Sequence, residues 1–72
     1  MSLPGEIDGQ RFLRAMGRFE WTVEKTRGSH RKLVHPAKGM IIVAFHKNLS
    51  RTSVRRALKQ AGISEDEFAR KL

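Results

Sequence analysis

Residues 28–45 read GSHRKLVHPAKGMIIVAF, and this stretch decides the fold. A turn at Gly28 and Ser29 leads into a strand over residues 30–35, and the segment 36–39, PAKG, is typical of a hairpin connection. Another strand follows over residues 40–45, where a nearly unbroken apolar run indicates a central or doubly covered position in a sheet. The stretch therefore predicts two antiparallel strands joined by a hairpin.

The pattern extends from this hairpin toward the N-terminus. In residues 19–24, FEWTVE, apolar and polar side chains alternate, which predicts a half-buried strand. A helix is expected over residues 8–17, with Asp8 as its N-cap and Gly17 as the left-handed residue that closes it. Residues 1–7 are expected to form a loose N-terminal segment.

Toward the C-terminus the periodicity becomes helical. Ser50 can cap a second helix that Gly62 would end, and Ser64 and Glu67 form an S-x-x-E capping box that opens a short last helix. The predicted order is helix, three strands, helix, short helix. We therefore expect one α+β domain over residues 1–72, with a three-stranded antiparallel sheet covered by helices on one face.

Charge gives the first indication of function. The chain has 15 Lys and Arg against 7 Asp and Glu, a formal net charge of +8 and a pI near 11.2. Such a field favours a polyanionic partner, and nucleic acid is the commonest one because each neutralised phosphate releases condensed counterions. An anionic membrane is a weaker alternative, and a well-solvated surface without a partner is another.

Several classes of protein are excluded by composition. The chain has no cysteine, which rules out thiolate catalysis, disulfides and sulfur-bound zinc, and which fits a reducing compartment. Its longest apolar run, residues 40–45, is too short to cross a bilayer, and its first residues lack the basic and apolar regions of a secretion signal. We expect a cytoplasmic protein that needs no cofactor and does not act at a membrane.

Three motifs resemble the HicA (YcfA-like) toxin family. Arg27-Gly28-Ser29-His30 is similar to the G-S-H signature of that family, and His35-Pro36 with the small turn after it is similar to its second hairpin. Residues 55–64 are similar to its C-terminal helix and cap. The resemblance covers residues 9–72, and three motifs in the right order are far more specific than a lone tripeptide.

The resemblance implies a fold, an activity and a partner. It implies a fold similar to a double-stranded-RNA-binding domain, an mRNA-cleaving activity with a catalytic histidine at His30, and a HicB-type antitoxin. Two positions depart from the family pattern. Thr52 stands where a glycine usually opens the second helix, which could alter how that helix begins, and Leu33 stands where many relatives carry an aromatic residue, which could weaken base stacking.

The residues around His30 suit RNA cleavage on chemical grounds alone. RNA carries its own nucleophile, the 2′-hydroxyl, so cleavage needs a base for that proton, cations on the phosphate and an acid for the leaving oxygen. An imidazole can act as the base, and general acid–base catalysis contributes roughly 10²- to 10⁴-fold. Nearby cations favour the neutral form of an imidazole and also hold phosphate. The candidate RNA-binding residues here are Lys25, Arg27, Gly28, Ser29, Arg31 and Lys32.

Other interpretations of the histidines stay open. Without the resemblance, His30 would more often be a turn residue that contacts phosphate without chemistry. His35 should face the opposite side of a regular strand from His30, so we expect no metal site between them. His46 is a candidate for a second functional imidazole, although such a residue more often merely ends a strand. Glu24 is the nearest carboxylate that could orient His30.

A second basic cluster follows His46 and comprises Lys47, Arg51, Arg55, Arg56 and Lys59. Helical spacing places Arg51, Arg55 and Lys59 on one stripe, and no acidic residue between Lys47 and Lys59 balances the charge. We expect RNA to contact Lys47 and this stripe, with an acidic antitoxin surface competing for the same charges. An ordinary polar helix face is the alternative interpretation.

Two classes of function therefore remain. The first is a metal-independent endoribonuclease that acts as the mRNA-cleaving toxin of a type II toxin-antitoxin pair. The second is a non-catalytic RNA- or DNA-binding module with the same basic surface. A third, weaker possibility is a family member that only binds its antitoxin.

Overall fold

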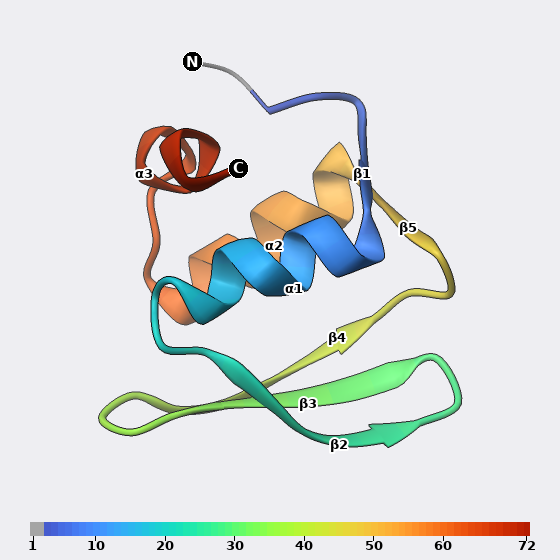
Figure 1. The fold of residues 1–72 in the computed structure, drawn as a ribbon, viewed down its shortest axis with the longest axis vertical. Coiled ribbons are helices and arrows are strands. Elements are labelled where there is room, and N and C mark those ends of the chain that lie inside the picture. The colour runs from blue at the N-terminus through green and yellow to red at the C-terminus, as the bar shows by residue number, and fades with distance from the viewer. Residues whose placement is uncertain (1–2) are drawn as a thin grey trace.

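The computed structural model describes residues 3–72, which form three helices. Figure 1 shows the helices packed beside a twisted sheet. The α+β prediction is confirmed, with short strands in addition to those of the predicted sheet. The strands are β1 (Glu6–Asp8), β2 (Thr22–Arg27), β3 (His30–His35), β4 (Gly39–Ala44) and β5 (Asn48–Ser50), and the helices are α1 (Gly9–Gly17), α2 (Arg51–Ala61) and α3 (Glu65–Lys71).

The main sheet is antiparallel in the order β2-β3-β4, so β3 is its central strand. Figure 1 shows α1 and α2 on one side of this sheet. The opposite side, called the open face below, carries no helix formed by residues 3–72. The turn between β2 and β3 forms where the sequence predicts it. Gly28 has a φ of 59° there, a left-handed conformation that glycine adopts without steric cost.

The apolar run of β4 does not lie at the centre of the sheet, so that expectation was wrong. β4 is an edge strand whose side chains alternate between two environments. Ile41 and Val43 are buried against the helices, whereas Met40 and Ile42 on the open face are 47% and 46% exposed. The polar β3 takes the central position because its sequence neighbours on both sides are also its hairpin partners.

The strand predicted over residues 19–24 begins later, at Thr22, and runs to Arg27. Trp21 is buried just before it, but every residue of β2 is exposed, including Val23. A register shift between Val23 and Lys25 interrupts the alternation. Such a bulge changes the face on which the following side chains lie, so the alternating pattern could not be extended along the whole strand.

Helix α1 starts as predicted and ends differently. The Asp8 carboxylate accepts hydrogen bonds from the backbone N–H groups of Gln10 (3.0 Å) and Arg11 (3.2 Å). The predicted left-handed closure at Gly17 is wrong, because the helix ends through Arg18 in a right-handed conformation. The positive φ falls instead on Glu20, at 68°, just before the chain turns toward β2.

A loose segment was expected over residues 1–7, but residues 3–7 are anchored in the core by Leu3 and Ile7, and residues 1 and 2 lie outside the described residues. Leu3 and Ile7 are each 1% exposed, and β1 pairs with β5 in a two-stranded antiparallel ribbon that the sequence analysis missed. The Arg51 Nε atom donates to the carbonyl groups of Leu3 (3.1 Å) and Pro4 (3.3 Å). Strands of three residues carry too little periodicity to be recognised in a sequence.

The caps of α2 and α3 lie where the sequence predicts them. The Ser50 hydroxyl accepts the backbone N–H of Ser53 at 3.2 Å, and Gly62 closes α2 with a φ of 71°. The Ser64 hydroxyl accepts the backbone N–H of Glu67 at 3.1 Å and lies 3.2 Å from the Glu67 carboxylate. These local hydrogen bonds fix where each helix begins.

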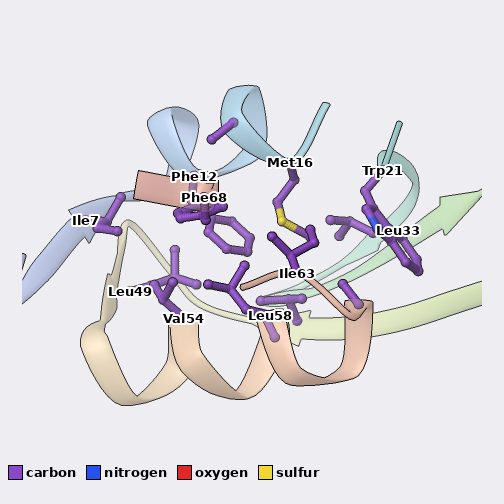
Figure 2. Packing of buried hydrophobic residues seen from close by; sticks show 14 of the residues in the cluster. Ile7, Phe12, Met16, Trp21, Leu33, Leu49, Val54, Leu58, Ile63 and Phe68 are labelled. Carbon is purple, nitrogen blue, oxygen red and sulfur yellow. The ribbon is translucent and has the colours of Figure 1, made fainter. Parts of the chain in front are cut away.

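The core fills the space between the helices and the covered face of the sheet (Figure 2). Trp21, Phe12 and Phe68 are the largest of its fully buried side chains. The Phe12 ring lies 6.0 Å from the Phe45 ring and 5.8 Å from the Phe68 ring, between centroids. These aromatic residues therefore serve core packing.

Candidate functional site

His30 is the first residue of β3, and its imidazole is exposed at the open face of the sheet. It pairs with Arg27 on β2 and with Ala44 on β4, so three strands fix its position. The Gly28 turn lies directly before it. The carbonyl group of Ser29 accepts the backbone N–H of Phe45 at 2.9 Å, which ties this turn to the end of β4.

Two concavities meet at His30. The first, of about 380 Å³, lies on the open face and is called the sheet concavity; its lining residues are Lys25, Arg27, His30, Lys32 and Ile42. The second, of about 250 Å³, lies between β4 and α2 and is called the β4–α2 cleft. His30 and Ile42 line both, and Arg56 and Gln60 line the cleft from α2. Among residues 3–72, no acidic side chain lines either one.

Strand register explains why the cations gather beside His30. Lys25 pairs with Lys32, which pairs in turn with Ile42, so these side chains form one row on the open face. The neighbouring row contains Arg27, His30 and Ala44. Lys25 and Arg27 are two residues apart and so lie on one face of β2. The register shift between Val23 and Lys25 makes this the open face, which His30 shares.

Glu24, the carboxylate nearest to His30 in sequence, does not line either concavity at His30. Glu24 Oε1 lies 3.0 Å from Lys32 Nζ, and both side chains are partly exposed. Such exposed ion pairs are worth little, about 0–1 kcal/mol. The partner of the Glu24 carboxylate is therefore Lys32, whose charge it moderates.

Arg31 contributes to the site through the backbone. Its guanidinium donates to the carbonyl groups of Ser29 (3.0 Å) and Phe45, and its Cζ atom lies 3.8 Å from the centroid of the Phe45 ring. Its Nη2 atom also lies 3.5 Å from the His46 carbonyl oxygen. The hydrogen bonds of Arg31 thus connect the turn before His30 with the segment after β4. The sequence had suggested that Arg31 contacts RNA directly.

The predicted stripe on α2 is largely occupied by contacts within the protein. Arg51 holds the N-terminal segment, as described above, and Arg55 forms an ion pair with Glu65 of α3. Lys59 is exposed but does not line either concavity at His30, and neither does Lys47 in the bend before β5. The structure therefore does not bring this stripe together with His30.

The α2 residues that do lie beside His30 are Arg56 and Gln60, which the sequence analysis did not assign to the site. They share the cleft wall with Ser53 and Ala57. The spacing of these four residues, three or four apart, places them on one side of the helix, and this is the signal that could have found them. Which side of α2 borders β4 is decided by packing, and sequence periodicity alone does not give it.

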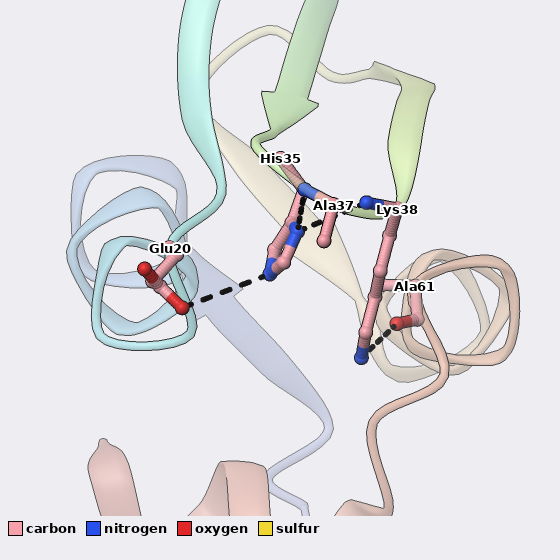
Figure 3. A network of polar contacts seen from close by, with 5 residues as sticks. All are labelled: Glu20, His35, Ala37, Lys38 and Ala61. Carbon is pink, nitrogen blue, oxygen red and sulfur yellow. Dashed lines mark hydrogen bonds and ion pairs between the residues drawn. The ribbon is translucent and has the colours of Figure 1, made fainter.

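His46 and His35 lie apart from His30. His46 is exposed in the bend after β4 and lines neither concavity. His35 packs against Trp21, with ring centroids 5.1 Å apart, and its Nδ1 accepts the backbone N–H groups of Ala37 (3.0 Å) and Lys38 (3.1 Å) (Figure 3). His35 therefore shapes the β3–β4 turn on the covered face, opposite His30 as predicted.

The structure also shows where Leu33 and Thr52, the two residues that depart from the family pattern, lie. Leu33 is fully buried in the core, so it lies away from any surface on which a base could stack. Thr52 is exposed in the first turn of α2, which begins regularly from its Ser50 cap. Within residues 3–72, no group of three His, Cys, Asp or Glu side chains could hold a metal ion.

These features define a class of protein: a small α+β domain of the double-stranded-RNA-binding-domain type, with a basic open sheet face around one imidazole. Residues 9–63 match the family described as HicA toxin of bacterial toxin-antitoxin systems, and the chain belongs to this family. It is therefore the toxin component of such a system, and membership implies a cognate antitoxin.

Comparison with curated proteins and with solved structures gave no match. The family assignment therefore stands on the match over residues 9–63 together with the fold. No helix within the described residues is long and apolar enough to span a membrane.

Proposed function

We propose that this protein is a metal-independent endoribonuclease that cleaves mRNA in the cytoplasm, with His30 as the general base. The observation that carries the proposal is the setting of His30, an exposed imidazole where two concavities meet. In the described part of the chain, four cationic side chains and no acidic one line these concavities. These cations are Lys25, Arg27, Lys32 and Arg56.

The chemistry needs few groups. The ring nitrogen of His30 takes the proton of the 2′-hydroxyl, and the 2′-oxygen then attacks the adjacent phosphorus. The bond from phosphorus to the 5′-oxygen breaks, and that oxygen takes a proton from water or from protonated His30. The products are a 2′,3′-cyclic phosphate and a 5′-hydroxyl end. Cations at the phosphate stabilise the charge that develops on its oxygens.

The open face also suits an antitoxin. Exposed Met40 and Ile42 lie beside the cations of the sheet concavity, so the surface combines apolar contact area with positive charge. A HicB-type antitoxin with acidic and apolar residues would complement both features and cover His30. Binding there would silence the toxin by excluding RNA.

The test compares purified wild-type protein with the His30→Ala variant on synthetic single-stranded RNA in the presence of EDTA. We expect wild-type cleavage with 2′,3′-cyclic phosphate ends, at least about 10²-fold slower cleavage by His30→Ala, and RNA binding by both proteins. His46→Ala is the matched histidine control and should still cleave.

Three results would count against the proposal. Equal cleavage by the wild type and His30→Ala would remove His30 from the mechanism. Products with a 5′-phosphate would indicate attack by water in place of the 2′-hydroxyl. RNA binding by the wild type without any cleavage would indicate a non-catalytic binding module.

A further inference from the structure

The β4–α2 cleft has a composition that the cleavage reaction alone does not require. Ile42 and Ala57 give it apolar walls, Arg56 and Gln60 give it polar groups, and His30 lies at one end. We infer that this cleft binds one unpaired nucleotide next to the bond that is cut, with Arg56 on its phosphate and Gln60 on its base. The inference rests on the proposed ribonuclease function.

The size of the cleft favours a single nucleotide. Its volume is about 250 Å³, in a molecule whose shortest dimension is 17 Å. A nucleic-acid duplex is too wide to enter it, whereas one base turned out of a single strand offers a flat apolar face for the walls. Sequence-specific RNA-binding proteins mostly recognise such unpaired bases, because the edges of paired bases in an RNA helix are hard to reach.

Arg56 is the α2 arginine that is free to bind a ligand. Arg51 is held by backbone carbonyls and Arg55 by Glu65, whereas no hydrogen bond or ion pair of the Arg56 side chain is found among residues 3–72. A guanidinium carries only donors and matches the geometry of a phosphate. Arg56 is therefore suited to hold the phosphate of a nucleotide in the cleft.

Gln60 has the chemistry to distinguish bases. It lies four residues after Arg56, one helical turn further along the same side of α2. Of the residues that the structure describes, it contributes the only side-chain amide that lines the cleft. An amide offers both a donor and an acceptor, and such groups recognise the edges of bases. Arg56 would thus contribute affinity for the phosphate, and Gln60 would contribute the preference for one base.

The first experiment maps cleavage positions on a pool of short single-stranded RNAs of randomised sequence. We expect wild-type protein to prefer one base beside the cut, and Gln60→Ala to weaken this preference about tenfold while still cleaving. Arg56→Ala should lower kcat/KM roughly tenfold for all sequences alike, and Arg56→Lys should recover part of the loss. Arg14→Ala, which removes one exposed charge from α1, is the matched control and should behave as the wild type.

A binding experiment keeps the inference testable without cleavage. RNAs with a 2′-deoxy residue at the cut lack the nucleophile, so their affinities can be measured with wild-type protein. We expect wild-type protein to bind oligomers that differ in one base with different affinities, and Gln60→Ala to bind them alike. Arg56→Ala should reduce the slope of log affinity against log salt by about 0.7, the value for one phosphate contact in single strands.

The outcomes separate the inference from the proposed function. If wild-type and Gln60→Ala proteins show the same base preference, or if Arg56→Ala binds RNA as Arg14→Ala does, the cleft does not hold a nucleotide. His30-dependent cleavage could still be observed in that case. Conversely, wild-type protein that binds with the expected preference but never cleaves would overturn the proposed function and leave the nucleotide site supported.

Discussion

At the scale of residues, the structure separates cations that hold the fold from cations that face outward. Arg31 and Arg51 donate to backbone carbonyls, whereas Arg27 and Arg56 line the concavities at His30. These residues look equivalent in the sequence, because charge alone does not say what a guanidinium contacts. Substitution of an arginine that donates to backbone carbonyls should therefore lower stability, whereas substitution of one that lines a concavity should leave stability nearly unchanged.

The first group is represented by Arg31. Arg31→Met should lower the free energy of unfolding by about 2 kcal/mol, because hydrogen bonds to charged groups are worth about 1.5–3 kcal/mol and the Ser29 and Phe45 carbonyls would lose their partner. Arg27→Met, the control on the neighbouring strand, should change it by less than about 0.5 kcal/mol. Urea denaturation followed by circular dichroism measures both, and equal effects would contradict the assignment.

Gly9 and Gly17, at the two ends of α1, provide a second matched pair. A Cβ atom at Gly9 would lie 2.7 Å from the Lys47 carbonyl oxygen and also against the Phe45 ring, whereas one at Gly17 would meet nothing within 4 Å. Gly9→Ala should therefore destabilise the protein by about 1–3 kcal/mol through overpacking. Gly17→Ala should stabilise it by up to about 1 kcal/mol through helix propensity. Thermal unfolding that shifts in the same direction for both variants would contradict this.

At the scale of elements, prediction succeeded where local chemistry decides the outcome. Asp8, Ser50 and Ser64 cap helices in the structure, and β3 has the predicted bounds, because a cap or a tight turn is specified by a few adjacent residues. The prediction missed elements whose pairing partners are distant in sequence. The β1–β5 ribbon joins residues about 42 apart, and no local pattern reveals it.

The same distinction applies to the candidate site. His30 could be found from its motif, and Lys25 and Lys32 from their proximity to it. Arg56 and Gln60 could not be assigned, because the packing of α2 against β4 decides which side of the helix borders the site. Arg55 looked unpaired because its partner, Glu65, belongs to another helix.

The N-terminal strand segment gives a prediction at this scale. Leu3 is 1% exposed, so Leu3→Ala should remove core contacts and lower the free energy of unfolding by about 2–4 kcal/mol. Ile42→Ala is the control, since Ile42 is 46% exposed and should contribute far less. Denaturant midpoints of the two variants give the measurement, and a negligible effect of Leu3→Ala would show that residues 3–7 do not belong to the packed domain.

At the scale of the whole molecule, a net charge of +8 does not mean that all cations bind one ligand. Four of them line the concavities at His30, while Arg31, Arg51 and Arg55 are engaged within the protein. Under the proposed function, the net charge would attract RNA from a distance, and the geometry of the open face would decide which phosphates are contacted.

Salt dependence of RNA binding tests this division. Four phosphate contacts predict a slope of log affinity against log salt near about −3 for single-stranded RNA, since each contact contributes roughly −0.7. The eight cations that the sequence suggested would give a slope near about −6. Fluorescence anisotropy between about 50 and 300 mM salt separates the two values, and the steeper slope would mean that the α2 stripe also binds RNA.

The placement of His30 on the face turned away from the hydrophobic core has a genetic consequence. Substitutions of His30 leave the buried contacts of the core intact. Activity can therefore be lost without loss of the folded structure. In a selection for cells that survive overexpression, the surviving alleles should fall into two groups. Alleles altered at the open face should yield abundant protein, and those altered in the interior should yield chains that proteases remove.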